Sequence, residues 1–191
     1  VMKHLHVHAD EYALNPDQIV TCGFSAGGHL VTLLGSYWNS DWLKEMVDVQ
    51  GDELKPCAQI DCYGLVEITP ALFDLAKQAA DASLMALSKA MLNTADPTVD
   101  QLKQINCVGL ASASVPPTFI WHTVEDQTVP VSQSLNFASA LHAHHVPFEM
   151  HLYKRGKHGL SSATADSGNR EDHVSTWVDL ALDWLTAYHL G

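Results

Sequence analysis

Residues 19–30, with the sequence IVTCGFSAGGHL, constrain the fold more than any other part of the chain. The first four of these residues are β-branched or small and are typical of a buried strand. The apolar residues 30–34 are typical of one side of a helix. The chain must therefore turn sharply between the two, where it carries Gly23, Ser25, Ala26, Gly27 and Gly28.

Glycine permits backbone dihedrals and a close backbone approach that a Cβ atom would forbid. A strand, a tight turn on serine and then a helix form the setting in which G-x-S-x-G becomes a nucleophile elbow, with the serine Oγ exposed above the sheet. The start of the helix offers N–H groups and a positive dipole to a developing anion. The motif alone arises by chance in roughly one chain of this length in fifteen. The flanking strand and helix, together with Gly28, make chance a much weaker explanation.

Length and charge exclude several classes of protein. With 191 residues, 47% of them hydrophobic, the chain can bury the core of one domain. A formal net charge of −12 and the lack of any basic run argue against binding to nucleic acid or to anionic membrane surfaces. No apolar run approaches the length of a transmembrane helix.

The four cysteines show no C-x-x-C spacing. Cys22 and Cys62 lie in apolar, strand-like runs, where a free cysteine behaves as a small buried hydrophobe. This favours structural thiols in a reducing compartment over a disulfide framework, so we expect a cytoplasmic protein.

Turn residues and apolar periodicity divide the chain into alternating strands and helices. Strands are expected at residues 19–24, 58–63, 118–123 and 148–153, and helices at residues 2–14, 26–35, 130–146 and 177–188. Such alternation predicts a parallel sheet with right-handed crossovers, and hence one α/β domain over residues 1–191. The Ala- and Leu-rich residues 65–115, with helical spacing around Leu72, Leu75, Ala76 and Ala79, are expected to form either a helical cap or lid, or merely a connecting helix pair.

A serine hydroxyl is a poor nucleophile unless a base removes its proton and a carboxylate orients that base. In a parallel sheet, catalytic groups gather at the carboxyl ends of the strands. The third expected strand is followed by Glu125 and Asp126, and the fourth by His158 in a loop beside Gly159. The chain order Ser25, Asp126, His158 is the order found in α/β-hydrolases.

Most of the other histidines are expected to be packed or solvated rather than catalytic: His142, His144, His145, His151, His173 and His189. His29, just inside the elbow helix, is expected to hydrogen-bond to a neighbouring loop. His4 and His8 are four residues apart and would share a helix face that could hold a metal ion weakly. No Cys or carboxylate completes a closed metal site there.

Three blocks of sequence resemble the acetyl-esterase/lipase group of α/β-hydrolases, which includes carbohydrate esterases: GFSAGGHL, PPTFIWHTVEDQTVPVSQSLNFASAL and VPFEMHLYKRGKHGL. They correspond to the blocks around the nucleophile, the acid and the base, and residues 177–185 resemble the group's final helix. Position within the H-x-x-x-D-x-x-V-P block places the acid at Asp126 rather than at Glu125. The resemblance implies a mostly parallel sheet with helices on both faces.

The activity implied by this resemblance is hydrolysis of esters with short acyl groups of the acetyl type. The alcohols of these esters include carbohydrates. No cofactor and no metal are implied, and the partner is a small-molecule ester. A peptidase of the prolyl-oligopeptidase kind, with the same fold, is one alternative. A metal-binding or non-catalytic interaction domain is another. A homo-oligomer is left open.

Members of this group carry a glycine-rich oxyanion loop well before the elbow, whereas residues 1–22 contain no glycine. This leaves the backbone N–H of Ala26, the residue after the serine, as the oxyanion donor. We therefore expect the chain to correspond to the C-terminal two thirds of such an enzyme. By itself it would be a poor catalyst, with the sheet edge beside residue 19 open to aggregation or pairing.

Overall fold

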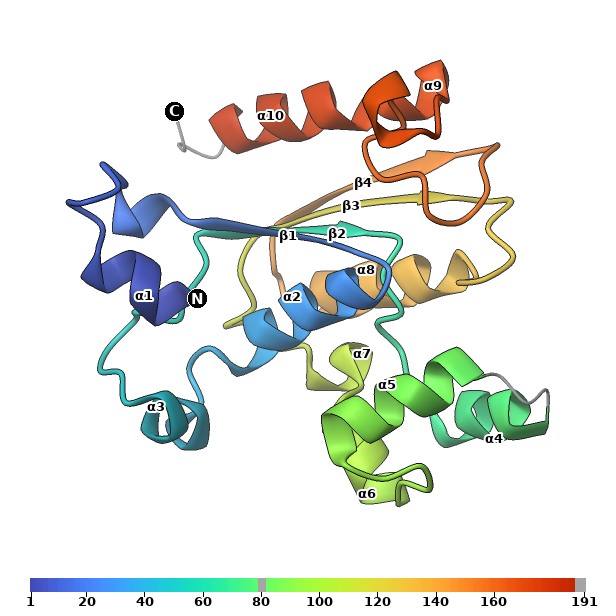
Figure 1. The fold of residues 1–191 in the computed structure, drawn as a ribbon, viewed down its shortest axis with the longest axis horizontal. Coiled ribbons are helices and arrows are strands. Elements are labelled where there is room, and N and C mark those ends of the chain that lie inside the picture. The colour runs from blue at the N-terminus through green and yellow to red at the C-terminus, as the bar shows by residue number, and fades with distance from the viewer. Residues whose placement is uncertain (79–81, 188–191) are drawn as a thin grey trace.

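Four parallel strands form the centre of the molecule in the computed structural model, which describes residues 1–78 and 82–187 (Figure 1). The strands β1 (Val20–Phe24), β2 (Ala58–Cys62), β3 (Thr118–Thr123) and β4 (Phe148–Tyr153) lie side by side in that order. Each pairs in parallel with the next, with Val20 opposite Ala58 and Thr118 opposite Phe148. The expected α/β architecture with a parallel sheet is confirmed.

Helices cover both faces of this sheet. The α-helices are α1 (Met2–Val7), α2 (Ala26–Tyr37), α3 (Asp41–Val47), α4 (Pro70–Gln78), α5 (Ala82–Leu92), α6 (Val99–Lys103), α7 (Cys107–Leu110), α8 (Ser132–Ala143), α9 (Asp172–Ser175) and α10 (Trp177–Ala187). In Figure 1, α10 lies over one face of the sheet, and α2 and α8 lie over the other. None of the described helices is long and apolar enough to cross a bilayer.

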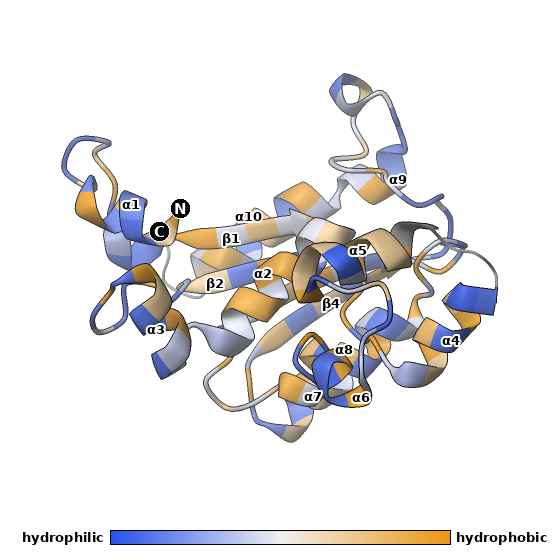
Figure 2. Cartoon of the chain, turned by 60° about the horizontal axis from the view of Figure 1, so that its bottom comes forward, coloured by the Kyte–Doolittle hydropathy of each residue, from blue (hydrophilic) through white to orange (hydrophobic). Residues whose placement is uncertain are grey.

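Every residue of the two central strands is buried, so both faces of these strands are covered. Successive side chains of β3 point to opposite faces. Phe119 and Trp121 pack with Trp177 and Trp184 of α10, whereas Ile120 packs with a second cluster that includes residues of α8. In Figure 2, β1 is mostly hydrophobic, while α4 carries both hydrophobic and hydrophilic segments.

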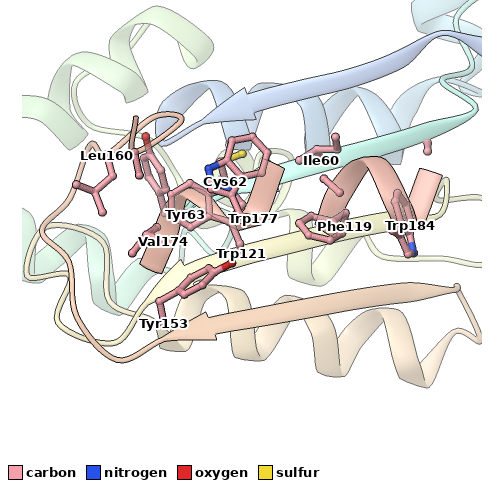
Figure 3. Close-up of a cluster of buried hydrophobic side chains, with 13 residues drawn as sticks. Ile60, Cys62, Tyr63, Phe119, Trp121, Tyr153, Leu160, Val174, Trp177 and Trp184 are labelled. Carbon is pink, nitrogen blue, oxygen red and sulfur yellow. The ribbon is translucent and has the colours of Figure 1, made fainter. Parts of the chain in front are cut away.

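The cluster under α10 is rich in aromatic rings. The indoles of Trp121 and Trp177 are stacked with centroids 5.3 Å apart, and Phe119 lies 5.7 Å from Trp184. Figure 3 shows these rings between the sheet and the final helix. Aromatic contacts of this kind contribute about 0.5–1.5 kcal/mol each beyond the area that they bury. They make the α10 face a rigid support for the loops at the carboxyl ends of the strands.

The segment between β2 and β3 forms α4 to α7 and has its own small core. The fully packed members of that core are Ile68, Phe73, Ala76, Leu84, Leu102 and Ile105. Leu72 packs against it, whereas Leu75 is 62% exposed. Ala79, which belonged to the same predicted stripe, lies outside the described residues.

Three sequence expectations differ from the structure. The helix expected at residues 2–14 ends at Val7, because Tyr12 and Leu14 are exposed and no core stabilises a longer helix. Helix α3 was not expected. Cys22 is exposed rather than buried, because β1 is at the sheet edge among the described strands. All four cysteines are free, as expected. The last helix was expected to end at residue 188, with the histidine at position 189 beside it. Both positions lie outside the described residues.

Candidate active site

Ser25 lies alone in the turn between β1 and α2, with φ of +55° and ψ of −118°. This conformation costs a residue with a side chain about 1–3 kcal/mol and persists only where the surroundings impose it. Here the N–H of Ser25 donates to the carbonyl of Cys62 at 2.9 Å, and its own carbonyl accepts the N–H of His29 at 3.1 Å. The turn is therefore fixed from the neighbouring strand and from the helix.

Two glycines make this turn sterically feasible. A Cβ atom at Gly23 would lie 2.1 Å from the carbonyl oxygen of Gly27, and one at Gly28 would lie 2.4 Å from Oδ1 of Asp61. A Cβ atom at Gly27 would meet nothing within 4 Å. Within the G-x-S-x-G motif, packing thus requires a glycine at Gly23 but not at Gly27.

This difference gives a test. We expect Gly23→Ala to lower the free energy of unfolding by about 3 kcal/mol or more, because its methyl group would meet backbone that cannot move aside. Gly27→Ala, the matched control inside α2, should be neutral or gain about 0.5–1 kcal/mol from helix propensity. Urea unfolding of both variants measures the effects. Equal losses in the two would contradict this account of the elbow.

His158 lies in the loop that follows β4 and contacts both other predicted site residues. Its Nδ1 is 2.6 Å from Oδ2 of Asp126, and its Nε2 is 2.8 Å from Oγ of Ser25. A carboxylate only accepts hydrogen bonds, so Nδ1 carries the hydrogen and donates it. In the neutral imidazole, Nε2 is then the acceptor for the serine hydroxyl. This is the tautomer that a general base on Ser25 requires.

Asp126 is held rigidly in the turn after β3. Its Oδ1 accepts the N–H groups of Thr128 and Val129, each at 2.9 Å, which leaves Oδ2 for the histidine. Asp126 is 7% exposed, whereas the neighbouring Glu125 is exposed. The structure thus turns Asp126, and not Glu125, towards His158.

A second histidine, which was not among the predicted site residues, also lies at the acid. His122 is fully buried on β3, and its Nε2 lies 2.9 Å from the carbonyl of Val129 and 3.4 Å from Oδ2 of Asp126. Its Nδ1 lies 2.8 Å from Oγ of Ser134. Burial lowers the pKa of His122, so this imidazole is neutral at neutral pH and donates from Nε2 to the Val129 carbonyl. The signal in the sequence that could have identified His122 is its H-x-x-x-D spacing to Asp126.

The backbone N–H of Ala26 is placed for an anion. Ala26 is the first residue of α2, and the first N–H groups of a helix have no intrahelical acceptor. Ser25 and Ala26 open onto a cavity of about 320 Å³. Side chains of α4 and α5, of the segment before α4 and of the loop after Asp126 line the rest of it: Leu65, Leu72, Leu75, Ala76, Leu84, Leu87, Thr128, Val129 and Pro130.

Asp61 lies next to the elbow, at the end of β2, and is fully buried. Its Oδ1 accepts the N–H of Gly64 at 3.0 Å, while Oδ2 has no hydrogen-bond partner among the described residues. Burial raises the pKa of Asp61 from 3.8 to about 7, although the Gly64 N–H acts in the opposite direction. A proton is therefore held in the folded protein over a range in which the unfolded chain releases it.

This pKa shift predicts how stability depends on pH. Stability should fall as the pH rises from about 4 to about 7, because the buried carboxyl must ionise, and it should stay low above that range. We expect Asp61→Asn to stabilise the protein by almost nothing at pH 4 and by an amount on the order of 4 kcal/mol at pH 8. Urea unfolding at pH 4, 6 and 8 measures this, with Asp74→Asn on the exposed side of α4 as the control. A gain that did not change with pH would contradict the assignment.

Three of the other histidines that the sequence singled out have ordinary partners. His4 Nε2 lies 3.0 Å from the hydroxyl of Tyr12, and His8 Nδ1 lies 2.9 Å from Oε2 of Glu11. His29 Nε2 lies 2.7 Å from the carbonyl of Ile105, the loop contact expected of it. Nowhere in residues 1–78 and 82–187 do three or more His, Cys, Asp or Glu side chains gather as metal ligands.

Comparison with known proteins places this site in context. The BD-FAE family model matches residues 1–141. The chain is 30% identical over 164 residues to endo-1,4-beta-xylanase B of Butyrivibrio fibrisolvens, covering 85% of this chain and 24% of that protein. It is 27% identical over 136 residues to the "probable carboxylic ester hydrolase LipM" of Mycobacterium tuberculosis, covering 70% of this chain and 30% of that protein.

A solved structure gives the same fold. The chain matches the crystal structure of an acetyl ester-xyloside bifunctional hydrolase from Caldicellulosiruptor lactoaceticus with a TM-score of 0.78 and 29% identity, covering 99% of this chain and 63% of that chain. The expected α/β-hydrolase fold is thereby confirmed. The chain spans 24% and 30% of the two curated relatives and less than two thirds of the solved structure.

Proposed function

The chain belongs to the BD-FAE family and has the α/β-hydrolase fold, and on that premise we propose that it is a serine hydrolase of carboxylic esters. The observation that carries the proposal is the continuous hydrogen-bonded chain from Ser25 through His158 to Asp126. The strained turn at Ser25 supports it, because backbone strain of this kind gathers at active sites.

In the proposed reaction the Oγ of Ser25 attacks the carbonyl carbon of the ester while Nε2 of His158 takes the hydroxyl proton. The carbonyl oxygen becomes an oxyanion, for which the N–H of Ala26 is a donor. As the C–O bond to the alcohol breaks, His158 returns the proton to the leaving oxygen. Water, deprotonated by the same imidazole, then releases the acid from the acyl-enzyme. Asp126 holds the imidazole in the tautomer that each step needs.

For the substrate, we propose short acyl esters of the acetyl type, with carbohydrates among the alcohols. The name of the solved relative, an acetyl ester-xyloside bifunctional hydrolase, supports this choice. We further propose that residues 65–115 act as a cap, whose helices α4 and α5 contribute leucines to the cavity beside Ser25. The cavity, at about 320 Å³, has room for acyl groups larger than acetyl.

A series of substrates tests the function. We expect hydrolysis of aryl acetate and aryl butyrate, resistance to chelators, and little or no cleavage of an aminoacyl-proline amide. Faster cleavage of the amide would favour a prolyl-oligopeptidase-like peptidase. Activity lost to a chelator and restored by a metal ion would contradict the metal-independent mechanism.

A single substitution tests the cavity as the acyl site. Leu87→Trp on α5 should narrow it and lower the ratio of butyrate to acetate hydrolysis by about 10-fold or more, since one or two methylenes are worth about 1–3 kcal/mol in such pockets. Leu92→Trp is the matched control, because Leu92 on the same helix lines a different groove beside Leu30 and Trp42. An equal change of the ratio in both variants would argue against this acyl site.

A further inference from the structure

Tyr63 follows β2 directly and is only 4% exposed. Its N–H donates to the carbonyl of Trp121 at 2.9 Å, so strand pairing extends to it, yet its φ is +45°. A left-handed backbone costs a bulky L-residue about 1–3 kcal/mol. A tyrosine in this strained position, directly beside the candidate site, points to its side-chain contacts.

The hydroxyl of Tyr63 contacts the loop that carries His158. It accepts the backbone N–H of Ser161, three residues after the histidine, at 2.9 Å. The carbonyl of Ser161 accepts the indole N–H of Trp177 at 3.1 Å. Two buried aromatic side chains therefore hold the N–H and the carbonyl of one loop residue. Gly159 and Ser161 both have left-handed backbones, with φ of +82° and +57°, so no regular secondary structure holds this part of the loop.

The ring of Tyr63 also contacts the histidine itself. Its centroid lies 5.0 Å from that of the His158 imidazole, with the planes at 76°. On another side it meets Trp121 at 4.9 Å. Figure 3 shows Tyr63 between Trp177 and the loop segment that carries Leu160. Packed rings thus connect the rigid core directly to the imidazole.

The residue before Tyr63 contacts the serine. The carbonyl of Cys62 accepts the N–H of Ser25, so two consecutive residues at the end of β2 hold the serine turn and the histidine loop. We propose that Tyr63 is a positioning residue that fixes the imidazole of His158 between Ser25 and Asp126. The inference rests on the proposed function, in which His158 is the base. Small displacements of a base cost rate without any loss of a reacting group.

Tyr63→Phe keeps the ring and removes only the hydroxyl that holds Ser161. We expect kcat/KM for an aryl acetate to fall about 10- to 100-fold, as for a catalytic group displaced by a fraction of an ångström to one ångström. Trp177→Phe removes the donor to the Ser161 carbonyl and should act in the same direction. Wild-type activity in both variants would overturn the proposal.

Tyr153→Phe is the matched control. Tyr153 is 5% exposed in the same cluster, but its hydroxyl lies 3.2 Å from Oγ1 of Thr176 and not against the histidine loop. It should lower Tm by about as much as Tyr63→Phe and leave kcat/KM within about twofold of wild type, since each variant loses one buried hydroxyl. Equal losses of activity in Tyr63→Phe and Tyr153→Phe would mean that Tyr63 is merely structural.

A second readout does not depend on turnover. The short hydrogen bond of 2.6 Å between His158 and Asp126 should give its proton a downfield NMR resonance. We expect this resonance in the wild type and in Tyr153→Phe, and its broadening or loss in Tyr63→Phe. If the wild type hydrolyses no ester and yet shows this pattern, the proposed function fails and the positioning role stands. An unchanged resonance in Tyr63→Phe overturns the positioning role whatever the protein hydrolyses.

Discussion

Ser25→Ala should abolish ester hydrolysis, with a fall in kcat on the order of 10⁶. The substitution removes the only atom that forms the covalent bond to the acyl group, and the imidazole of His158 then has no hydroxyl to activate. The effect of such a change does not add to that of losing the histidine, because the two groups act as one unit. Ser25→Ala and Ser25→Ala/His158→Ala should therefore be almost equally inactive.

The fold should survive this substitution. Serine and alanine both carry a Cβ atom, so the substitution adds no strain to the backbone of this turn, which has φ of +55° and ψ of −118°. The lost contact is one hydrogen bond, to Nε2 of His158. Covalent labelling by a fluorophosphonate, followed by peptide mass analysis, should modify Ser25 in the wild type and nothing in the variant. Labelling at another serine, or hydrolysis that persists in a folded Ser25→Ala protein, would exclude Ser25 as the nucleophile.

Local patterns predicted the strands of the sheet well. The expected strands at residues 118–123 and 148–153 agree with β3 and β4 to the residue. Helix α3 and the early end of α1 were not predicted, because short helices depend on what they pack against rather than on their own sequence. Val47 of α3, for example, packs against a cluster that contains Met2 and Trp38 from elsewhere in the chain.

Only some residues of the candidate site could be predicted from the sequence. Ser25, Asp126 and His158 could be named from the sequence because each lies in the segment that follows a strand, and parallel strands bring such segments to one edge. Tyr63 could not be named, although it also follows a strand. Its use depends on the N–H of Ser161, 98 residues away along the chain, which no periodicity or spacing reveals. Supporting residues of this kind become visible only when distant loops are placed together.

Asp126→Asn should lower turnover by about 10⁴ while leaving the protein folded. The amide is nearly the same size, and its oxygen can still accept the N–H groups of Thr128 and Val129, so the turn is kept. Its NH₂ group would then face Nδ1 of His158 and donate to it, which leaves the hydrogen on Nε2. An imidazole in that tautomer cannot take the proton of Ser25.

Glu125→Gln is the matched control, because it makes the same chemical change one residue away on an exposed side chain. It should change kcat by less than about twofold, in line with a surface substitution that touches none of the reacting groups. The pair should be assayed on one aryl acetate, together with the rate of labelling of Ser25 by a fluorophosphonate. Both rates depend on His158 as the base. Both should therefore fall in Asp126→Asn, and neither should fall in Glu125→Gln. If Glu125→Gln were the damaging change, the acid of the triad would be Glu125, and the contact of 2.6 Å between Asp126 and His158 would have no catalytic role.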